Sequence, residues 1–379
     1  AAQCSPLHMY QKLEHKGQKW GIFGWICLVG NVALIAFYSV VCGWLIYYFV
    51  KFLAGQSNLL SFEGMITNPA VNVIFLLITL AFAFGVLCFH LQGGLERVTK
   101  YIMSALLVLM AVLAIRSLTL PGAKDGMVFY LKPDFSKING SVFVGAMNQA
   151  FFTLSTGMGG MAIFGSYIGK ERSLMGEAIH VIVLDTLVAV LAGIIIFPAC
   201  MTYGLEVTAG PSLLFDTMAA VFSHMPGGQI WGTLFFLFMI FAAMSTVLGV
   251  CENILAMIRE KTGWSRKKGS LVCGSTLFLL ALTTALGYSV LHFQPFAKGT
   301  TWLDFWDFLV STNILPLGSL VLSLFCCNGF GWGWDAFVQE ANTGIGLKVK
   351  GWMKPIFRYV VPISIGFIYL YGILTFQWR

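Results

Sequence analysis

One short stretch of the chain places glycines and small polar side chains inside an apolar segment. Residues 151–160 read Phe-Phe-Thr-Leu-Ser-Thr-Gly-Met-Gly-Gly. Glycine and hydroxyl-bearing residues are poor helix formers, so the pattern predicts an interrupted helix. An interruption frees backbone carbonyl and amide groups, and the ends of its half-helices present partial charges to ions and to a zwitterionic substrate. The composition leaves a second interpretation equally open, in which the glycines only let helices pack closely.

Oxygen atoms that could bind a small cation occur at two further places. Ala242, Ser245 and Thr246 are spaced i, i+3 and i+4, which puts a carbonyl and two hydroxyls on one helical face. From spacing alone, hydroxyls that bond back to their own helix are the more common arrangement. Asp185 lies near the middle of an apolar segment, where an isolated carboxylate is costly and therefore indicates a functional role. A protonated Asp185 that is hydrogen-bonded to Gln149 is the alternative.

Two more polar side chains lie within apolar segments. Tyr38 is midway along the first of them, and a tyrosine hydroxyl at that depth needs a hydrogen-bond partner. From the residues alone, a neighbouring helix is favoured over a ligand as that partner. Glu252 is a second acid in an apolar segment, and the sequence assigns it no role.

The chain that must position these residues is too apolar for a soluble protein. Its 379 residues are 58% hydrophobic and 10% charged, against roughly 45–50% and about 25% in soluble domains. The net charge of +7 is spread along the chain without a dense basic stripe, which excludes a nucleic-acid binder. The composition predicts a single domain embedded in a lipid bilayer.

A sliding window of roughly 19 residues predicts nine membrane-spanning segments. Each is long enough for a hydrocarbon core of about 30 Å, and each must be helical because an isolated strand cannot satisfy its backbone groups in lipid. The predicted spans are 21–53, 71–90, 98–118, 142–168, 174–201, 228–258, 269–292, 302–327 and 355–376. Residues 1–20 are predicted to be the remnant of a cytoplasmic loop, and residues 21–379 the transmembrane domain, with the broken helix near 151–160.

Lysine and arginine are divided unevenly among the loops. The N-terminal stretch and the loops 91–100, 169–173, 259–268 and 328–354 are rich in them, whereas 201–227 has none and 292–301 has only Lys298. The loop 120–140 is the exception, with Lys124, Lys132 and Lys137. The positive-inside rule therefore predicts a multi-pass protein with a cytoplasmic N-terminus and, after nine spans, an outer C-terminus. The membrane is expected to be the plasma membrane.

The interrupted segment resembles a known family. The run from Gln149 to Ser155, followed by Gly157, Met158 and Gly159, resembles the broken sixth helix of the neurotransmitter:sodium symporter family, in particular its bacterial-type sodium-dependent amino-acid transporters. Residues 118–123 and 133–136 look like the family's extracellular loop before that helix. The resemblance implies an all-α membrane protein with the family's inverted-repeat fold. It also implies that the nine spans correspond to the family's third to eleventh helices and that the first two are absent.

The resemblance further implies roles for individual residues. Tyr38 matches the tyrosine that contacts the substrate carboxylate, and Asp185 matches a ligand of the first sodium. The implied substrate-binding residues are Tyr38, Phe152, Thr153, Ser155, Met158 and Val250; the implied sodium ligands are Thr153 and Asp185 at one site and Ala242, Ser245 and Thr246 at another; the implied gate residues are Tyr167, Glu260 and Asp307. Chloride-dependent relatives have a serine one turn after the Asp185 position, where this chain has Ala189. The resemblance therefore implies sodium as the coupling ion and no requirement for chloride, because the fixed charge of Asp185 replaces the anion.

The resemblance implies a symporter, not an enzyme, that imports an amino acid with sodium by alternating access. The apolar side chains of Phe152, Met158 and Val250 favour a hydrophobic amino acid. Because the first helix of the family supplies the other half of both sodium sites, residues 1–379 alone are expected to transport little or nothing.

Two other classes of function remain as alternatives. One is a non-transporting membrane fragment or an assembly partner. The other, a haem-carrying subunit, is disfavoured because His180 is alone in its helix and His90 and His292 lie at span ends. The sequence leaves open which amino acid is carried, the sodium stoichiometry and the oligomeric state, including a homo-oligomer.

Overall fold

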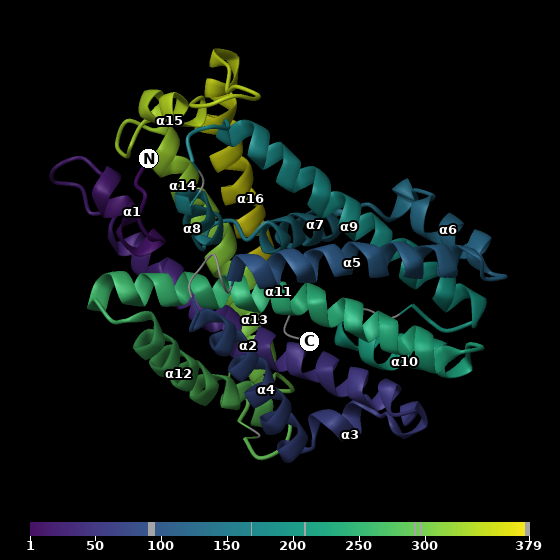
Figure 1. Ribbon diagram of the computed structural model, residues 1–379. Helices are drawn as coiled ribbons and strands as arrows, with labels where there is room; N and C mark the ends of the chain where they lie inside the picture. The colour runs from purple at the N-terminus through teal and green to yellow at the C-terminus, as the bar shows by residue number, and fades with distance from the viewer. Residues whose placement is uncertain (90–94, 168, 208–209, 292, 296–297, 376–379) are drawn as a thin grey trace.

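The computed structural model describes residues 1–89, 95–167, 169–207, 210–291, 293–295 and 298–375, apart from the side chains of Leu95 and Tyr167. Within these ranges the structure is almost entirely helical, and its β structure is an isolated parallel bridge between Arg172 and Ile345 (Figure 1). The α-helices are α1 (Pro6–Leu13), α2 (Ile22–Leu53), α3 (Phe62–Ile66), α4 (Pro69–Leu87), α5 (Leu95–Leu118), α6 (Ala123–Leu131), α7 (Gly140–Thr153), α8 (Gly160–Tyr167), α9 (Leu174–Thr202), α10 (Met218–His224), α11 (Gly228–Thr262), α12 (Arg266–Leu286), α13 (Trp302–Asp307), α14 (Leu315–Cys327), α15 (Trp334–Ala341) and α16 (Val361–Leu374). Short 3₁₀ helices are η1 (Ser57–Leu59), η2 (Phe135–Lys137) and η5 (Gly351–Met353), and π-helical turns are η3 (Leu213–Thr217), η4 (Phe308–Ile314) and η6 (Ile356–Val360).

Eight helical segments among the described residues are long and apolar enough to cross a membrane. The sequence predicts nine spans, and the difference is the segment 142–168. That segment is divided between α7 and α8, which have 14 and 8 residues, whereas a full crossing needs about 20. The ends predicted at His90, Ile168, His292 and Phe376 lie outside the described residues.

Local sequence explains where several of the spans begin. The side chain of Asn68 accepts hydrogen bonds from the backbone N–H groups of the first turn of α4, whose first residue is Pro69. Asn139 accepts one from the first turn of α7 in the same way. At α13, Thr301 and Asp304 cap each other's backbone N–H groups. These caps satisfy donors that have no partner within a helix, which fixes the start of each segment.

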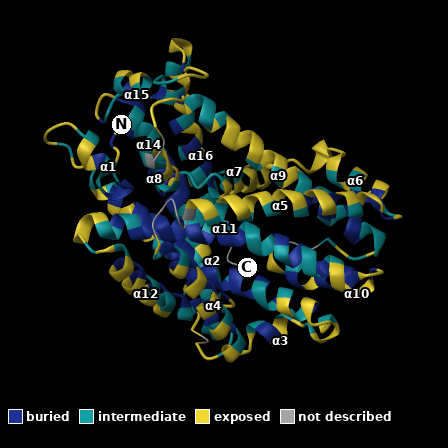
Figure 2. Ribbon diagram, in the orientation of Figure 1, coloured by how far each residue is buried: buried dark blue, intermediate teal, exposed yellow. Residues whose placement is uncertain are grey.

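The centre of the molecule is formed by α2 and α11, which pack along each other. In the apolar window of α2, 72% of the residues are buried, against 11% for α9. Figure 2 shows the buried residues concentrated on α2 and α11 and the exposed ones along α9. A buried hydrogen bond of 2.6 Å from Trp44 Nε1 to Asn72 Oδ1 also joins α2 to α4. Because apolar surface gains little by leaving lipid, close packing and such interhelical hydrogen bonds hold the bundle together.

Candidate functional site

The helix interruption predicted for residues 151–160 is present. α7 ends at Thr153 and α8 begins at Gly160. Between them, Gly157 and Gly159 have φ angles of +84° and +75°, a region that residues with a side chain rarely adopt. Ser155 also has a positive φ, of +48°. The glycines therefore serve the backbone path of the break as well as close packing.

The break packs against α14. A Cβ atom added at Gly157 would lie 2.4 Å from the carbonyl oxygen of Leu315, and one added at Gly318 would lie 2.3 Å from the carbonyl oxygen of Gly157. Beside this contact, the Ser319 hydroxyl donates to Thr156 Oγ1 at 2.8 Å. The two segments thus meet backbone to backbone, and only glycine fits on either side.

Replacing Gly157 by alanine is expected to lower the free energy of unfolding by roughly 2–5 kcal/mol, because it adds left-handed backbone strain to the clash with Leu315. Thermal unfolding of the detergent-purified protein measures the loss. Gly165→Ala is the matched control, since a Cβ there meets nothing within 4 Å and alanine is the better helix former. Equal losses for the two variants would contradict this account of the break.

Two buried amides that the sequence did not single out hold the break to the central helices. Asn31 of α2 donates to the carbonyl oxygens of Cys27 at 2.7 Å and of Met158 at 2.8 Å. It accepts a hydrogen bond of 3.0 Å from Asn253 Nδ2 of α11. Both asparagines are at most 1% exposed. The sequence could have indicated both asparagines, because a polar amide within an apolar membrane span usually has a specific partner.

The first pair of predicted sodium ligands is brought together. Thr153, the last residue of α7, donates its hydroxyl hydrogen to Asp185 Oδ1 of α9 at 2.7 Å. Asp185 is half-buried. Within the described residues this threonine, rather than Gln149, is the hydrogen-bond partner that the structure gives the acid. The contact places a carboxylate at the point where the regular helix ends.

The second group of predicted ligands lies on the face of α11 that meets α2. The Ser245 hydroxyl donates to the carbonyl oxygen of Ala242 at 2.8 Å, so Ser245 bonds back to its own helix. The Thr246 side chain lies beside the Tyr38 hydroxyl. The Tyr38 ring also contacts that of Phe152, with centroids 6.4 Å apart. Tyr38 therefore joins the oxygen-bearing face of α11 to the end of α7.

The remaining predicted substrate residues belong to the central apolar cluster or to the break. Met158 and Val250 are buried members of the central apolar cluster, against which Tyr38 and Phe152 pack. Ser155 is half-buried in the break itself. The residues predicted for substrate binding thus come from α2, α7, α11 and the break.

The predicted gate residues lie at the ends of the helices. Glu260, near the end of α11, accepts a hydrogen bond of 2.8 Å from the Ser5 backbone N–H and lies 3.3 Å from His8 Nδ1, so it holds α1. Burial raises the pKa of the Cys4 thiol, and the negative charge of Glu260 adds to the rise. Asp307 accepts a hydrogen bond of 2.6 Å from Ser311. Tyr167 is the last residue of α8, and its side chain lies outside the described part of the structure.

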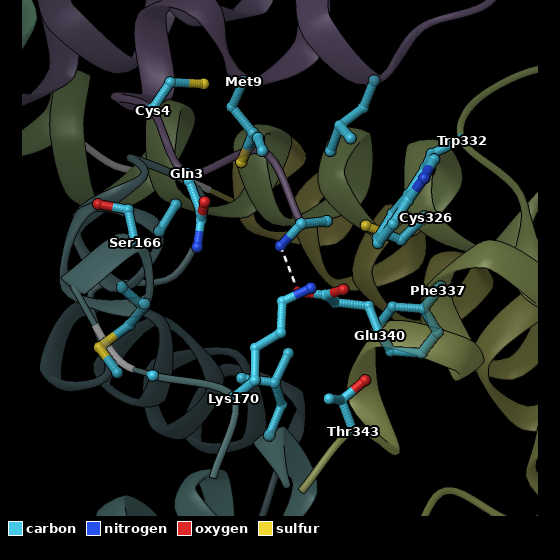
Figure 3. A pocket seen from close by; sticks show the side chains of 18 of the residues that line it. Gln3, Cys4, Met9, Ser166, Lys170, Cys326, Trp332, Phe337, Glu340 and Thr343 are labelled. Carbon is cyan, nitrogen blue, oxygen red and sulfur yellow. Dashed lines mark hydrogen bonds and ion pairs between the residues drawn. The ribbon is translucent and has the colours of Figure 1, made fainter. Parts of the chain in front are cut away.

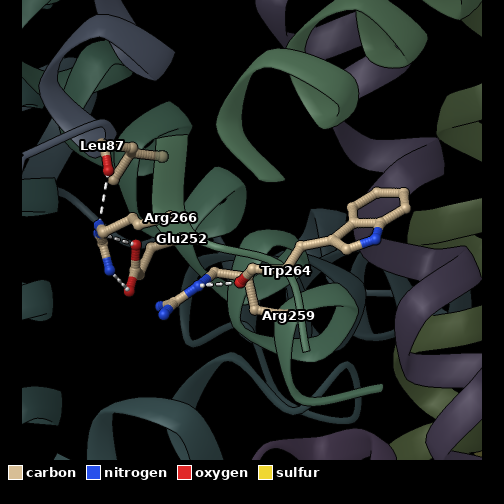
Figure 4. Close-up of polar contacts among 5 residues, drawn as sticks. All are labelled: Leu87, Glu252, Arg259, Trp264 and Arg266. Carbon is tan, nitrogen blue, oxygen red and sulfur yellow. Dashed lines mark hydrogen bonds and ion pairs between the residues drawn. The ribbon is translucent and has the colours of Figure 1, made fainter. Parts of the chain in front are cut away.

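Glu252, to which the sequence assigned no role, forms a buried ion pair. Both carboxylate oxygens accept from the Arg266 guanidinium, at 3.1 and 2.5 Å. Arg266 Nε also donates to the carbonyl oxygen of Leu87 at 2.6 Å (Figure 4). The glutamate side chain is 2% exposed and that of the arginine 16%. One arginine therefore ties α11 and the end of α4 to the start of α12.

A cavity of about 260 Å³ lies away from these residues, between α1, α8 and α15. Figure 3 shows Ser166 on one side of it and Trp332 and Phe337 on the other. None of the residues predicted to bind substrate or sodium lines this cavity. The residue contacts at the break, rather than this cavity, therefore define the candidate site.

A bundle of apolar helices in which one helix is interrupted beside hydroxyls and an acid is an arrangement typical of membrane transporters. A family model described as the sodium:neurotransmitter symporter family matches residues 56–379. A sodium-dependent transporter of Haemophilus influenzae is 32% identical over 364 residues, which cover 93% of this chain and 79% of the relative. The sodium-dependent transporter YhdH of Bacillus subtilis is 32% identical over 383 residues, which cover 99% and 84%.

A solved structure is also similar. The crystal structure of MhsT in complex with L-phenylalanine matches with a TM-score of 0.87 and 33% identity, over 97% of this chain and 85% of MhsT. The chain belongs to the sodium:neurotransmitter symporter family. It is a multi-pass, sodium-dependent membrane transporter and not an enzyme, and the predicted all-α symporter fold is confirmed.

Proposed function

We propose that the protein imports a hydrophobic amino acid together with sodium, by alternating access around the break between α7 and α8. The observation that carries the proposal is that α9 and α2 both contact the end of α7, and that the same residue of α2 contacts α11. Asp185 of α9 accepts from Thr153, and Tyr38 of α2 contacts both Phe152 and Thr246 of α11. In secondary transporters, half-helix ends and unwound backbone bind the ion and the charged groups of the substrate.

Thr153 and Asp185 are the proposed protein ligands of a first sodium ion. A carboxylate and a hydroxyl whose oxygens are already 2.7 Å apart form part of a hard-oxygen site. Asp185 supplies a fixed negative charge there, and the position one turn later is Ala189, which has no hydroxyl. We therefore propose that transport does not require chloride.

Ala242, Ser245 and Thr246 are the proposed ligands of a second sodium ion. The Ser245 hydroxyl and the Ala242 carbonyl oxygen are 2.8 Å apart on one face of α11. If the Ser245 hydroxyl hydrogen rotates away from the Ala242 carbonyl oxygen, lone pairs of both oxygen atoms become available to a cation. Sodium bound at the two sites would favour the outward-open state, in which substrate binds.

Tyr38, Phe152, Thr153, Ser155, Met158 and Val250 are the proposed substrate-binding residues. The Tyr38 hydroxyl would meet the substrate carboxylate, and Phe152, Met158 and Val250 would surround an apolar side chain. A hydrophobic amino acid is favoured by this apolar lining and by the similarity to MhsT, whose structure contains L-phenylalanine.

Tyr167 and Glu260 are proposed for the cytoplasmic gate and Asp307 for the outer one. The protein is proposed to lie in the plasma membrane, and its lysine-rich and arginine-rich loops favour a cytoplasmic N-terminus. Glu260 already bonds α1, so opening on that side would need the contacts with Ser5 and His8 to break.

The proposal is tested by uptake of radiolabelled L-phenylalanine into proteoliposomes with an inward gradient of sodium or of choline. Two proteins are compared: residues 1–379, and the same residues preceded by the first two helices of a family member. Sodium-dependent uptake is expected from the extended protein, with or without chloride, and little uptake from residues 1–379.

Each result has a distinct meaning. Uptake by residues 1–379 would contradict the expectation that the extra helices are needed. If neither protein binds or takes up any hydrophobic amino acid, the proposed substrate class is wrong. Uptake that is equal in sodium and choline would overturn the coupling.

A further inference from the structure

A groove runs along the outer surface of the molecule where α4 and α12 pack side by side. Its volume is about 470 Å³. Apolar and small residues line it almost completely, among them Leu77, Phe84 and Gly85 of α4 and Leu271, Gly274 and Phe278 of α12. The groove is independent of the proposed transport site, none of whose residues lines it.

The groove is open toward the bilayer and narrow at its base. Leu271 is 72% exposed and Leu279 is 66% exposed, although both belong to a membrane-spanning helix. A Cβ added at Gly85 would meet nothing within 4 Å, whereas one added at Gly274 would lie 3.0 Å from the Phe84 ring. The two helices therefore approach closely at Gly274 and leave an open channel beside Gly85. A channel of this kind fits a flexible hydrocarbon chain.

The turn of α12 that precedes Ser270, the first residue of that helix to line the groove, is positively charged. Lys267 and Lys268 are exposed in the first turn of α12, which contains no acidic residue. Arg266 beside them is engaged by Glu252, but in the part of the chain that the structure describes neither lysine forms an ion pair. Lysines at a helix N-terminus add to the positive end of the helix dipole, which is unfavourable unless an anion is nearby. The Lys268 ammonium also lies 5.0 Å from the Trp264 ring centroid, and tryptophan favours the membrane interface.

The length of α12 from Lys268 to Leu279, at the other end of the groove, matches the thickness of one leaflet's hydrocarbon layer. Lys268 and Leu279 are eleven residues apart on α12, or about 16 Å along the axis. Half of a hydrocarbon core of about 30 Å is about 15 Å. A lipid with its phosphate at the lysines would therefore extend its chain along the whole groove.

We propose that the groove between α4 and α12 binds an anionic phospholipid, with one acyl chain beside Gly85 and the headgroup phosphate at Lys267 and Lys268. Charge complementarity selects the anionic headgroup, since a zwitterionic lipid would bring its own cation to two lysines and a helix N-terminus. The lipid is structural in this position, because it fills the seam between two spans and neutralises the charge at the start of α12.

Native mass spectrometry of the detergent-purified chain tests the proposal with dioleoyl phosphatidylglycerol and dioleoyl phosphatidylcholine, which share their acyl chains. Preferential retention of phosphatidylglycerol is expected. Lys267→Gln combined with Lys268→Gln should weaken its binding roughly thirty-fold, which is about 2 kcal/mol for two lysines. Gly85→Leu places a side chain in the channel, where a Cβ meets nothing within 4 Å, and should remove retention of the lipid, while thermal unfolding checks that the variant folds.

Matched variants control for general effects. Lys350→Gln combined with Lys354→Gln removes the same charge elsewhere, and Gly366→Leu fills open space on α16, so both should retain the lipid as the unmodified protein does. Equal retention of the two lipids, unchanged retention in Gly85→Leu, or equal losses in the controls would each overturn the proposal. The proposal would also be overturned if the unmodified protein is a dimer and Gly85→Leu is a monomer with unaltered lipid retention. A second copy of the chain, rather than a lipid, would then occupy the groove.

Discussion

Replacing Asp185 by alanine is expected to weaken sodium binding by at least roughly 100-fold and to abolish sodium-dependent binding of phenylalanine. Loss of a group that only supports a metal ligand costs about 10–100-fold in affinity, and Asp185 is proposed as a direct ligand. The substitution would also leave the Thr153 hydroxyl without its acceptor at 2.7 Å. A sodium titration of radiolabelled phenylalanine binding to the extended protein measures the effect.

Asp185→Asn separates the charge of the side chain from its shape. It keeps a ligating oxygen but removes the fixed charge, so sodium affinity should fall and added chloride should restore part of it. Asp125→Asn on α6 is the matched control, since Asp125 is an exposed acid on a helix that contributes no residue to the proposed site. Unchanged binding by Asp185→Asn in chloride-free buffer would contradict both the ligand role and the proposed reason for chloride independence.

Replacing Arg266 by methionine is expected to cost about 3–5 kcal/mol of the free energy of unfolding. The change leaves the Glu252 carboxylate, whose side chain is 2% exposed, without its guanidinium partner. It also removes the hydrogen bond to the Leu87 carbonyl oxygen that ties the end of α4 to α12. Thermal unfolding in detergent measures the loss, and Lys267→Met provides a neighbouring loss of charge at an exposed position.

A second substitution tests whether the ion pair causes that loss. Adding Glu252→Leu to Arg266→Met removes the stranded charge, so the double variant should be more stable than Arg266→Met alone. If the losses of unfolding free energy from Glu252→Leu and Arg266→Met are instead additive, the two side chains are not energetically coupled. The ion pair drawn in Figure 4 would then not be the source of the stability.

Much of the fold follows from the sequence because the bilayer allows few solutions. Apolar segments of about 20 residues must be helical in lipid, so hydropathy alone predicts the spans, and the structure places α4, α9 and α11 within a few residues of them. The break was predictable for a local reason as well. Glycines and hydroxyls at 153–160 disfavour the helix whatever surrounds them, and α7 ends at Thr153.

The candidate site was predictable only in part. The resemblance selected Thr153, Asp185, Tyr38 and Thr246, and the structure brings them together in two pairs. The spacing of Ala242 and Ser245 left their hydrogen bonding open, and the structure shows Ser245 bonded back to its own helix. Whether these residues bind sodium and substrate stays a prediction for the experiments above.

The sequence by itself determined which segments are apolar enough to form membrane-spanning helices and where one of them must break. Only the tertiary structure decided which polar groups meet inside. Asn31 bonds to Met158 across 127 residues and to Asn253 across 222, and Glu252 finds Arg266 only because a turn brings α12 back along α11. Helix formation depends on neighbours in sequence and on the solvent, so a local pattern predicts it. A buried polar group must instead find a partner on another helix, and that partner is fixed only when the helices pack.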